Sequence, residues 1–528
     1  MPFFKTDDLQ AWTGGSWFNL NSKKIDIRGF GIDSRNIHPD FAFVALKGER
    51  DGCDFAADAV KNGATAVIAD RELDVGAPVL VVKNPLKALQ TVAKLHRLRF
   101  ENPVVAITGS CGKTSTKEML AKLLSWKNPV YTEKNYNNEI GVPLTLTKID
   151  IRQNQLAIVE AGVGAPDQMK ELAEMIEPDI AIITNVGLAH LERFKDVAAV
   201  AREKAVLPAH VSENGWCVMH QNLLSWKAFD ELTCKKAVLA SADAPDVKAD
   251  LVFRYAITKT DGGTSAIDMC VEGGEEYYFE APQMSAGMLD NTLLAIAASL
   301  MLGAKEEQLA AKIETLKPLP MRGGIVESGA VKYYIDCYNA SPTSMRDALQ
   351  NFAEIAKDAP KLYVLGSMAE LGIATHRHHK EVGANIPFAG GCKAVLVGAS
   401  ADIYKAGLLE NGWNEADISV FETSQAAAEK ILEFTEGFVF VKGSRVCELE
   451  KALPSAVLKA AGEAEIRAEE EISAPAEDPE PAEDEPPANS PEEQPENGEE
   501  DEDSFDEDGA EDFDDSDGGI DFEDEREF

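Results

Sequence analysis

Residues 103–116, PVVAITGSCGKTST, limit the fold more than any other part of the sequence. A short apolar run leads into a loop of small residues, and Gly112-Lys113-Thr114 then opens a stretch typical of a helix. Small residues let backbone N–H groups approach a polyphosphate, and the first turn of a helix favours an anion. In such a loop the lysine reaches the terminal phosphates and the threonine hydroxyl binds Mg²⁺. The spacing differs from the general GxxxxGK(S/T) pattern because Ile107 stands five residues before Gly112, so a glycine-rich turn without a ligand is the alternative.

The rest of the body alternates short apolar runs with helix-like stretches. The runs, most of which end in Gly or Asn, cover residues 41–46, 103–109, 156–162, 179–185, 361–366, 393–398 and 437–443. Helix-like stretches such as 113–126 and 342–357 lie between them. Continuous apolar strands that alternate with helices indicate mainly parallel sheets, so the predicted fold class is α/β. Residues 250–282 differ, because polar and apolar side chains alternate there around two glycine turns, which favours antiparallel strands.

Charge divides the chain into a folded body and an acidic tail. The formal net charge is −40, from 51 Lys and Arg against 91 Asp and Glu. Of these, 32 acidic but only two basic residues fall between Glu463 and Phe528, where aliphatic side chains are also scarce. Such a segment cannot bury enough surface to offset chain entropy, so residues 463–528 are predicted to be disordered. A tether for a basic partner and a solubilising spacer are the two interpretations of this tail, and composition favours the spacer.

The body is predicted to contain three compact units, covering residues 1–84, 85–318 and 319–462. Its mild acidity argues against a nucleic-acid surface. No run of about 18 apolar residues predicts a membrane span, and the start MPFFKTDDLQAW lacks the apolar core of a signal peptide. The eight cysteines are scattered without a CxxC pair, which argues against a disulfide framework or zinc site and favours the cytoplasm. Cys111 is interpreted as a small residue of the glycine loop rather than a nucleophile.

The loop TGSCGKTS resembles the TGSxGKT signature of the Mur ligase family, and further segments agree in order along almost the whole body. This family makes peptidoglycan precursors by ATP-dependent amide bond formation, so the resemblance implies a ligase of cell-wall biogenesis, cell shape and cell division. It implies three domains: a small N-terminal α/β domain, a central parallel sheet of the P-loop type, and a Rossmann-like C-terminal domain. The ATP-binding loop residues that it implies are Gly109, Ser110, Cys111, Gly112, Lys113, Thr114 and Ser115, with Lys113 also catalytic.

Residues 31–55, GIDSRNIHPDFAFVALKGERDGCDF, resemble the uridine-nucleotide-binding element of one branch of the family. That branch joins D-alanyl-D-alanine to UDP-N-acetylmuramoyl-tripeptide, so these two small molecules are the implied substrates. The implied contacts with the uridine nucleotide are Asp33, Ser34, Arg35, Lys47, Gly48 and Asp51. An arginine, a hydroxyl and turn glycines suit a diphosphate and a uracil edge. A surface turn with a structural Asp–Arg pair is the alternative.

The central unit carries the implied metal ligands. Glu160 ends one apolar run and His190 follows another, where open α/β sheets place their sites. By the resemblance, Glu160 and Thr114 hold one Mg²⁺, while Glu160 and His190 help to hold a second. Lys204 matches the lysine that this family carbamylates with CO₂, which turns a repelled ammonium into an anionic metal ligand. A solvated helix lysine is the alternative for Lys204.

Other segments imply contacts with the nucleotide and the acyl substrate. NYNNEIGVPLTL resembles the family's NNxxGVP segment, in which Asn137 and Asn138 would contact the acyl substrate; bare asparagines are more often turn formers. MSAGMLDNTLLAIAAS resembles the adenine-binding helix, with Asn291 at the adenine edge. Arg322 in LPMRGG is the implied catalytic contact with the γ-phosphate, and Asp336 the implied acceptor of a ribose hydroxyl.

The third unit contains IDCYNASPTSM, GSMAELG and VKGSR, which resemble the last motifs of the same branch. Asn339 and Ser341 are implied residues of the substrate loop, and His379 matches the histidine that follows MAELG. Lys442 and Arg445 could meet the carboxylate of the incoming dipeptide. Together with the phosphate loop, these motifs imply an acyl-phosphate mechanism, and the enzyme is expected to be a monomer.

Two rival interpretations are kept open. The first is a sister amide ligase or a folylpolyglutamate synthase, against which the MAELG and DCYNASP segments argue. The second is a non-catalytic nucleotide-binding scaffold, which is favoured by three departures from the family pattern, Val206, Gly287 and Met321. The sequence retains the lysine of the phosphate loop and every implied metal ligand, which argues for a catalytic enzyme.

Overall fold

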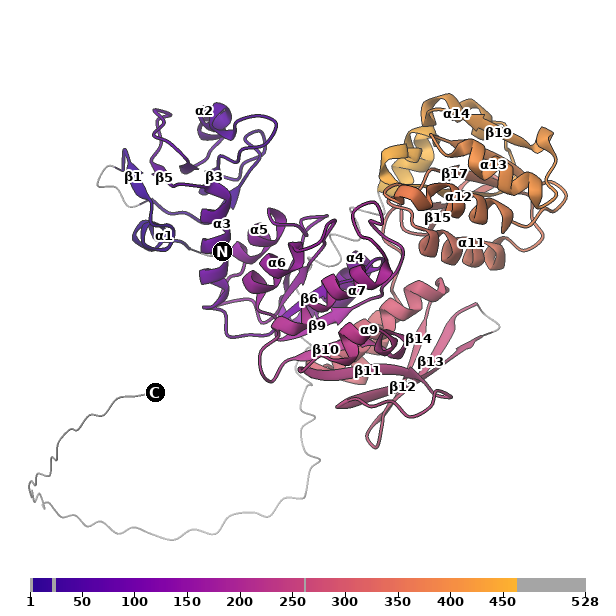
Figure 1. The fold of residues 1–528 in the computed structure, drawn as a ribbon, viewed down its shortest axis with the longest axis horizontal. Coiled ribbons are helices and arrows are strands. Elements are labelled where there is room, and N and C mark those ends of the chain that lie inside the picture. Colours follow the sequence, from indigo (N-terminus) through magenta and orange to yellow (C-terminus); the bar gives the residue numbers. More distant parts are fainter. Residues whose placement is uncertain (1–2, 21–24, 261–262, 463–528) are drawn as a thin grey trace, which may run out of the picture. The chain divides into compact units, whose positions relative to one another are not determined.

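The computed structural model describes residues 3–20, 25–260 and 263–462, which form three β-sheets flanked by helices (Figure 1). Strands and helices alternate in each sheet, so the predicted α/β class is confirmed. The predicted disordered tail, residues 463–528, lies outside the described residues. Within the described part, every helix is too short or too polar to pass through a bilayer.

The first sheet has five strands in the order β1-β5-β4-β3-β2, and only β1 runs antiparallel to its neighbour. Its strands are β1 (Ser16–Phe18), β2 (Gly29–Gly31), β3 (Phe41–Val44), β4 (Ala66–Ala69) and β5 (Val79–Val81), and its helices are α1 (Thr6–Thr13), α2 (Ala56–Lys61) and α3 (Pro85–Arg97). Helix α3 begins where Asn84 Oδ1 accepts the Lys87 N–H at 3.1 Å. Its Leu89 and Val92 pack into the core of this sheet, and α3 also contacts α5 (Gly141–Thr147) of the next unit. The boundary after residue 84 stays a prediction, because it precedes a helix that two units share.

The central sheet has nine strands in the order β14-β13-β12-β11-β10-β9-β6-β8-β7. The strands are β6 (Val104–Thr108), β7 (Val130–Tyr131), β8 (Ala157–Glu160), β9 (Ile180–Ile183), β10 (Trp216–His220), β11 (Lys235–Ser241), β12 (Leu251–Lys259), β13 (Ser265–Val271) and β14 (Glu276–Ala281). All neighbours from β7 across to β12 pair in parallel, whereas β12, β13 and β14 pair antiparallel. The antiparallel strands expected within residues 250–282 are therefore confirmed.

Helices cover both faces of the parallel strands. They are α4 (Lys113–Leu123), α5, α6 (Gln168–Ile176), α7 (Val197–Ala205), α8 (Lys227–Asp230), α9 (Ala286–Met301) and α10 (Glu306–Ile313). Val105 and Ile107 of β6 pack with α4, α9 and α10, whereas Val104 and Ala106 pack with α5 and α6 on the other face. Every residue of β6, β8 and β9 is buried, which explains why these strands are unbroken apolar runs in the sequence.

The third sheet has six strands in the order β15-β16-β20-β17-β18-β19, all parallel except for the hairpin of β15 and β16. The strands are β15 (Gly324–Ser328), β16 (Val331–Asp336), β17 (Lys361–Gly366), β18 (Lys393–Val397), β19 (Ile418–Phe421) and β20 (Gly437–Lys442), and the helices are α11 (Pro342–Ala356), α12 (Thr375–Ala384), α13 (Ala401–Glu410) and α14 (Ser424–Leu432). Tyr334 packs with α11, α12 and α13 on one face, and Ile335 packs with α14 on the other. This two-sided covering is the arrangement predicted for a Rossmann-like domain.

Candidate active site

Three neighbouring strands of the central sheet, β6, β8 and β9, end at one edge, and the predicted phosphate loop lies there. Residues 109–112 join β6 to α4. Gly112 has a φ of +81°, and a Cβ on it would lie 2.3 Å from Asn291 Oδ1 of α9. Glycine avoids both the strain and the overlap, so the loop backbone can lie directly against Asn291. The structure therefore brings the predicted adenine residue and the phosphate loop together.

The segment after β9 holds the phosphate loop in place. Asn185 Oδ1 accepts the Cys111 N–H at 2.9 Å, and the Asn185 carbonyl accepts the Ser110 N–H at 3.1 Å. A Cβ on Gly109 would lie only 1.8 Å from Thr184 Oγ1, which explains the glycine there. Thr184 and Asn185 are not among the residues predicted from the sequence. The signal that could find them is their position directly after the strand that neighbours β6.

The first residues of α4 place charge and hydroxyl groups beside this loop. Lys113 Nζ donates to the Gly109 carbonyl at 3.0 Å, so the side chain folds back across its own loop. Thr114 is half-buried and Ser115 is buried. The ammonium group therefore lies next to the backbone that an anion would face, as predicted for a phosphate loop.

Glu160 ends β8, and its side chain is only 1% exposed. Its Oε1 accepts a hydrogen bond from Asn137 Nδ2 at 2.7 Å. Its Oε2 is also buried, and within the described residues it has no hydrogen-bond partner. A buried carboxylate oxygen without a partner is costly, and a hard cation that prefers oxygen ligands would remove that cost. The residues present therefore fit Mg²⁺, with the Thr114 hydroxyl as a further oxygen at the same sheet edge.

His190 follows β9 in the left-handed region, with a φ of +54°. Its Nδ1 lies 2.6 Å from Glu370 Oε2, in the loop after β17, although the contact lacks the geometry of a hydrogen bond. Burial lowers the pKa of His190, the Glu370 carboxylate opposes this, and the charges of Lys113 and Lys204 lower the pKa further. The lowered pKa favours the neutral imidazole, which is the form that can bind a metal ion. Glu370 lies within the MAELG segment, but its contact with His190 is not predicted from the sequence.

Lys204 lies near the end of α7 with its side chain buried. Burial, together with the nearby charge of Lys113, lowers the pKa of Lys204 to about 7. A solvated helix lysine, the alternative interpretation, is therefore not what the structure shows. At neutral pH a substantial fraction of this amine is uncharged, which is the form that can react as a nucleophile.

In the third unit, Asp336 and Lys442 lie at the ends of neighbouring strands β16 and β20. Lys442 Nζ lies 2.6 Å from Asp336 Oδ2, and it also donates to the Asn339 carbonyl at 3.1 Å. The Lys442 side chain is 2% exposed. The predicted direct contact of Lys442 with a dipeptide is therefore not supported, because the ammonium points into the protein at Asp336.

His379 is also enclosed. Its side chain is fully buried, Nε2 accepts the Met368 N–H at 2.8 Å, and Nδ1 donates to the Thr375 carbonyl at 2.7 Å. Both ring nitrogens serve the backbone of the loop and helix around it, so a direct substrate contact by His379 is not supported either. Arg445 differs, because its side chain is half-exposed and pairs with Glu450 at 2.6 Å.

Other predicted residues shape the loops around the site. Asn138 Oδ1 accepts the Ile140 and Gly141 N–H groups, which is the turn-forming alternative. Ser341 caps α11, and its Oγ lies 3.3 Å from Cys111 Sγ in the phosphate loop. The Arg322 guanidinium stacks 4.1 Å from the centre of the Tyr338 ring. These contacts place Ser341 at the phosphate loop and leave the Arg322 role a prediction.

The DSR element follows β2 in the first sheet. Arg35 donates from Nε and Nη2 to the two Asp33 oxygens, both at 2.9 Å. The Arg35 side chain is largely exposed, so this pair alone matches the structural alternative as well as a ligand site. Ser34 is buried, and its carbonyl accepts a hydrogen bond from Asn62 Nδ2 at 2.8 Å.

The loop after β3 forms a second cluster at the same edge of the first sheet. Lys47 pairs with Asp70 at 2.5 Å, and Arg71 pairs with Asp51 at 3.0 Å. The Gly48 N–H donates to a backbone carbonyl within the turn. Because β2 and β3 are parallel neighbours, the two predicted uridine elements emerge side by side.

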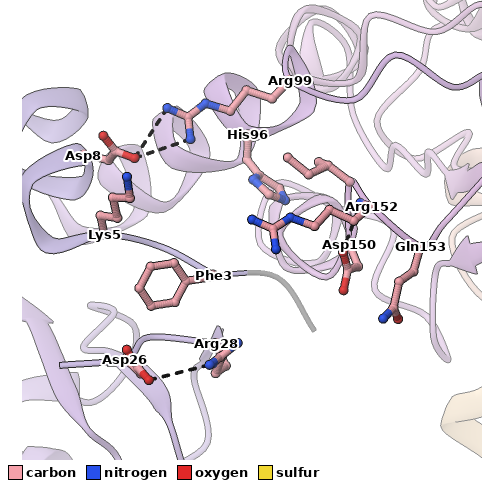
Figure 2. A pocket seen from close by; sticks show the side chains of 11 residues that line it. Phe3, Lys5, Asp8, Asp26, Arg28, His96, Arg99, Asp150, Arg152 and Gln153 are labelled. Carbon is pink, nitrogen blue, oxygen red and sulfur yellow. Dashed lines mark hydrogen bonds and ion pairs between the residues drawn. The ribbon is translucent and has the colours of Figure 1, made fainter.

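A cavity of about 690 Å³ lies elsewhere, lined by residues of the first unit such as Asp8 and Arg28 and by residues that precede the central strands β6 and β8 (Figure 2). His96 and Arg99 line it just before β6, and Asp150 and Arg152 line it before β8. Arg99 pairs with Asp8 at 3.4 Å on one side of the cavity, as Figure 2 shows. Because the phosphate loop follows the carboxyl end of β6, this cavity is at the opposite edge of the sheet and is separate from the site.

The sequence of this chain is similar to those of known proteins. Three family models match: Mur ligase family, catalytic domain (residues 26–98); Mur ligase middle domain (107–299); and Mur ligase, glutamate ligase domain (321–445). The UDP-N-acetylmuramoyl-tripeptide–D-alanyl-D-alanine ligase of Escherichia coli (strain K12) is 30% identical over 449 residues, which cover 82% of this chain and 94% of that protein. The chain belongs to the Mur ligase family. A Bacillus subtilis (strain 168) ligase of the same name is 30% identical to this Mur ligase over 379 residues, covering 70% of this chain and 80% of that one.

Solved structures agree with the fold of this Mur ligase. A crystal structure of MurF from Acinetobacter baumannii matches with a TM-score of 0.73 and 25% identity, over 86% of this chain and 98% of that one. A MurF ligase from Thermotoga maritima in complex with ADP matches with a TM-score of 0.67 and 24% identity, over 83% of this chain and 98% of that one. The three-domain Mur ligase architecture predicted from the sequence is confirmed.

Proposed function

We propose that this Mur ligase uses ATP to join D-alanyl-D-alanine to UDP-N-acetylmuramoyl-tripeptide, giving the pentapeptide precursor of peptidoglycan. The observation that carries the chemistry is at the carboxyl ends of the central strands, where a phosphate loop lies beside a buried Glu160 oxygen that has no hydrogen-bond partner among the described residues. Relatives that match over most of their length carry the name of this ligase, which supports the choice of substrates. A monomer in the cytoplasm is part of the proposal, whereas a basic partner for residues 463–528 stays a prediction.

The reaction is proposed to begin when ATP binds. Its phosphates lie against residues 109–115, and its adenine edge is hydrogen-bonded by Asn291. The substrate carboxylate attacks the γ-phosphorus, the bond from that phosphorus to the bridging oxygen breaks, and ADP leaves. Lys113 and Arg322 neutralise the developing charge. The amine of D-alanyl-D-alanine then attacks the acyl phosphate, and the tetrahedral intermediate releases phosphate and a proton. Phosphate is a far better leaving group than a bare carboxylate oxygen, which is why ATP is required.

Thr114, Glu160 and His190 would hold Mg²⁺, which when bound supplies charge neutralisation for the phosphoryl groups. We propose that Lys204 joins this set as a carbamate. Its pKa of about 7 supports this, because an uncharged amine can attack CO₂, lose a proton and become an anionic oxygen ligand. The carbamate would lie close to the other proposed ligands, because the charges of Lys113 and Lys204 both lower the pKa of His190.

We propose one substrate for each unit: the uridine nucleotide for residues 1–84, ATP for residues 85–318 and the dipeptide for residues 319–462. The three matching family models, which cover residues 26–98, 107–299 and 321–445, support this division. The proposed substrate-binding residues are Asp33, Ser34, Arg35, Lys47, Gly48, Asp51, Asn137, Asn138, Asn339, Ser341 and Arg445. Asp336 is the proposed acceptor of a ribose hydroxyl of ATP.

The test is phosphate release from Mg·ATP with UDP-N-acetylmuramoyl-tripeptide, measured with and without D-alanyl-D-alanine, with the product identified by mass. Release that needs both substrates and yields the pentapeptide is expected. Lys113→Met should abolish it, and Lys170→Met, a change on the exposed face of α6, is the matched control. Nucleotide binding without turnover on any stem peptide would instead support a scaffold and contradict the ligase.

A further inference from the structure

The end of the third sheet contains an ion pair whose buried lysine has no role in the function proposed above. Asp336 is the last residue of β16 and Lys442 the last of β20, and the two stand directly opposite in a parallel pair. Their side chains meet at 2.6 Å between Nζ and Oδ2. The lysine side chain is 2% exposed and the carboxylate 19% exposed. The cation is thus enclosed, whereas the carboxylate keeps an opening at the edge where ligands of α/β sheets bind.

The ammonium group of Lys442 has no hydrogen left for a ligand. It carries three N–H donors. They serve Asp336 Oδ2 at 2.6 Å, the Asn339 carbonyl at 3.1 Å and the Asp336 carbonyl at 3.4 Å. By contrast, Asp336 Oδ1 accepts no hydrogen bond from any described residue. The pair therefore presents one free carboxylate oxygen and no free ammonium hydrogen.

The same strand end also fixes the loop that follows Asp336. Lys442 bonds the Asn339 carbonyl, and Ser444 Oγ donates to the Ala340 carbonyl at 3.3 Å. One residue later Ser341 caps α11. The loop from Asp336 to the start of α11 is therefore held at two points by the VKGSR segment, so the direction of the Asp336 carboxylate is set by Lys442 rather than by solvent.

We propose that Lys442 is a positioning residue, which holds Asp336 through its Oδ2 atom and aims the free Oδ1 atom at the ribose hydroxyls of ATP. It does not bind the dipeptide. A hydroxyl donor is the ligand that this geometry fits, because it can donate to Asp336 Oδ1 while Oδ2 stays bonded to Lys442, and the ribose of ATP supplies such hydroxyls. The inference rests on the proposed function in taking ATP as the nucleotide at Asp336.

The test compares calorimetric binding of ADP, 2′-deoxy-ADP and 3′-deoxy-ADP to the full chain. Wild type should bind at least one deoxy analogue about tenfold or more weakly, because a charged hydrogen bond is lost. Lys442→Met should bind all three nucleotides with nearly equal affinity, and Lys442→Arg should recover part of the discrimination. Lys405→Met, which alters an exposed pair with Glu415, is the matched control and should discriminate like wild type.

Two results would overturn the proposal. One is discrimination against the deoxy analogues that survives in Lys442→Met, or that is absent from wild type. The other is a rise of tenfold or more in KM for D-alanyl-D-alanine with nucleotide discrimination intact, which would make Lys442 a dipeptide ligand. If Lys442→Met does not fold, Asp336→Asn tests the same link, since it should lose the discrimination while Lys442 is retained. Binding of ADP needs no dipeptide, so failure of the ligase assay would leave this test standing.

Discussion

Two sheet edges in this molecule hold buried charge in opposite ways. At the edge of the central sheet, Glu160 keeps one buried oxygen without a partner in the described structure. At the edge of the third sheet, Lys442 is equally buried, but all three of its N–H donors are bonded within the protein. Both residues end a strand, so position alone does not distinguish them.

This difference in hydrogen bonding distinguishes Glu160, which can bind a cation, from Lys442, which orients another side chain. An unpaired buried carboxylate oxygen costs free energy in the isolated protein, and this cost is recovered only when a cation binds. A fully bonded ammonium gains nothing from a ligand, but its removal leaves a carboxylate unpaired. The two edges should therefore respond in opposite directions when the charge at each is removed.

Glu160→Gln is expected to have the largest effect on activity. Phosphate release should fall by about 10²–10³-fold, because the charge that stabilises the transferring phosphoryl group through its cation is lost. In EDTA the free energy of unfolding should not fall, and should rise by about 1 kcal/mol, because a neutral amide is cheaper to bury than an unpaired carboxylate. Urea unfolding checks this, with Glu174→Gln on the exposed face of α6 as control. A clear loss of stability in Glu160→Gln would end the comparison.

Lys442→Met should show the opposite balance. Its free energy of unfolding is expected to fall by about 3 kcal/mol, because Asp336 loses its buried partner. The carboxylate is 19% exposed, which keeps the loss at the lower end for buried pairs. Lys405→Met removes an exposed pair and should cost less than about 1 kcal/mol. If Lys442→Met and Lys405→Met lost equal free energy of unfolding, burial of the Lys442–Asp336 pair would have no energetic consequence.

The strands could be predicted from the sequence because both faces of the sheets are covered. Every residue of β17 is buried, and its observed range, Lys361–Gly366, matches the apolar run residue for residue. The phosphate loop can also be predicted, because its glycines are required by the local backbone. Gly112 has a positive φ, and a Cβ on it would clash with Asn291. Local pattern and two-sided burial therefore account for most of the fold and for the centre of the site.

The sequence could not give the direction of side chains across strands. Lys442 and Asp336 are 106 residues apart, and only the register of β16 against β20 brings them together. The motif VKGSR identifies the lysine but not its partner, so the sequence alone predicts a dipeptide contact in place of the ion pair with Asp336. His379 is similar, because the backbone groups that it bonds belong to a turn whose shape no periodicity reveals.

The buried Lys204 of the central unit should make the free energy of unfolding depend on pH. Its pKa is about 7 in the folded protein against about 10.5 in the unfolded chain, so between these values the unfolded state binds more protons. The free energy of unfolding should therefore rise with pH, by about 1.4 kcal/mol per pH unit between pH 7 and 10. Urea unfolding of wild type and Lys204→Met in CO₂-free buffer measures the difference. Lys204→Met should lack this slope, and parallel pH curves for the two proteins would contradict a buried, neutral lysine.

Two adjacent asparagines should show the same difference between a residue at the cation site and a purely structural one, with the smallest effects on stability. Within the described residues the Asn138 side chain bonds only the Ile140 and Gly141 N–H groups at the start of α5, so Asn138→Ala should cost about 1 kcal/mol whether or not Mg²⁺ is present. Asn137 supplies the single hydrogen bond to the Glu160 carboxylate in the described structure, so Asn137→Ala leaves that carboxylate more dependent on a cation. Its loss of stability should be larger in EDTA than in Mg²⁺, as unfolding in the two buffers would show. If Mg²⁺ protects both variants equally, Glu160 is not where the cation binds.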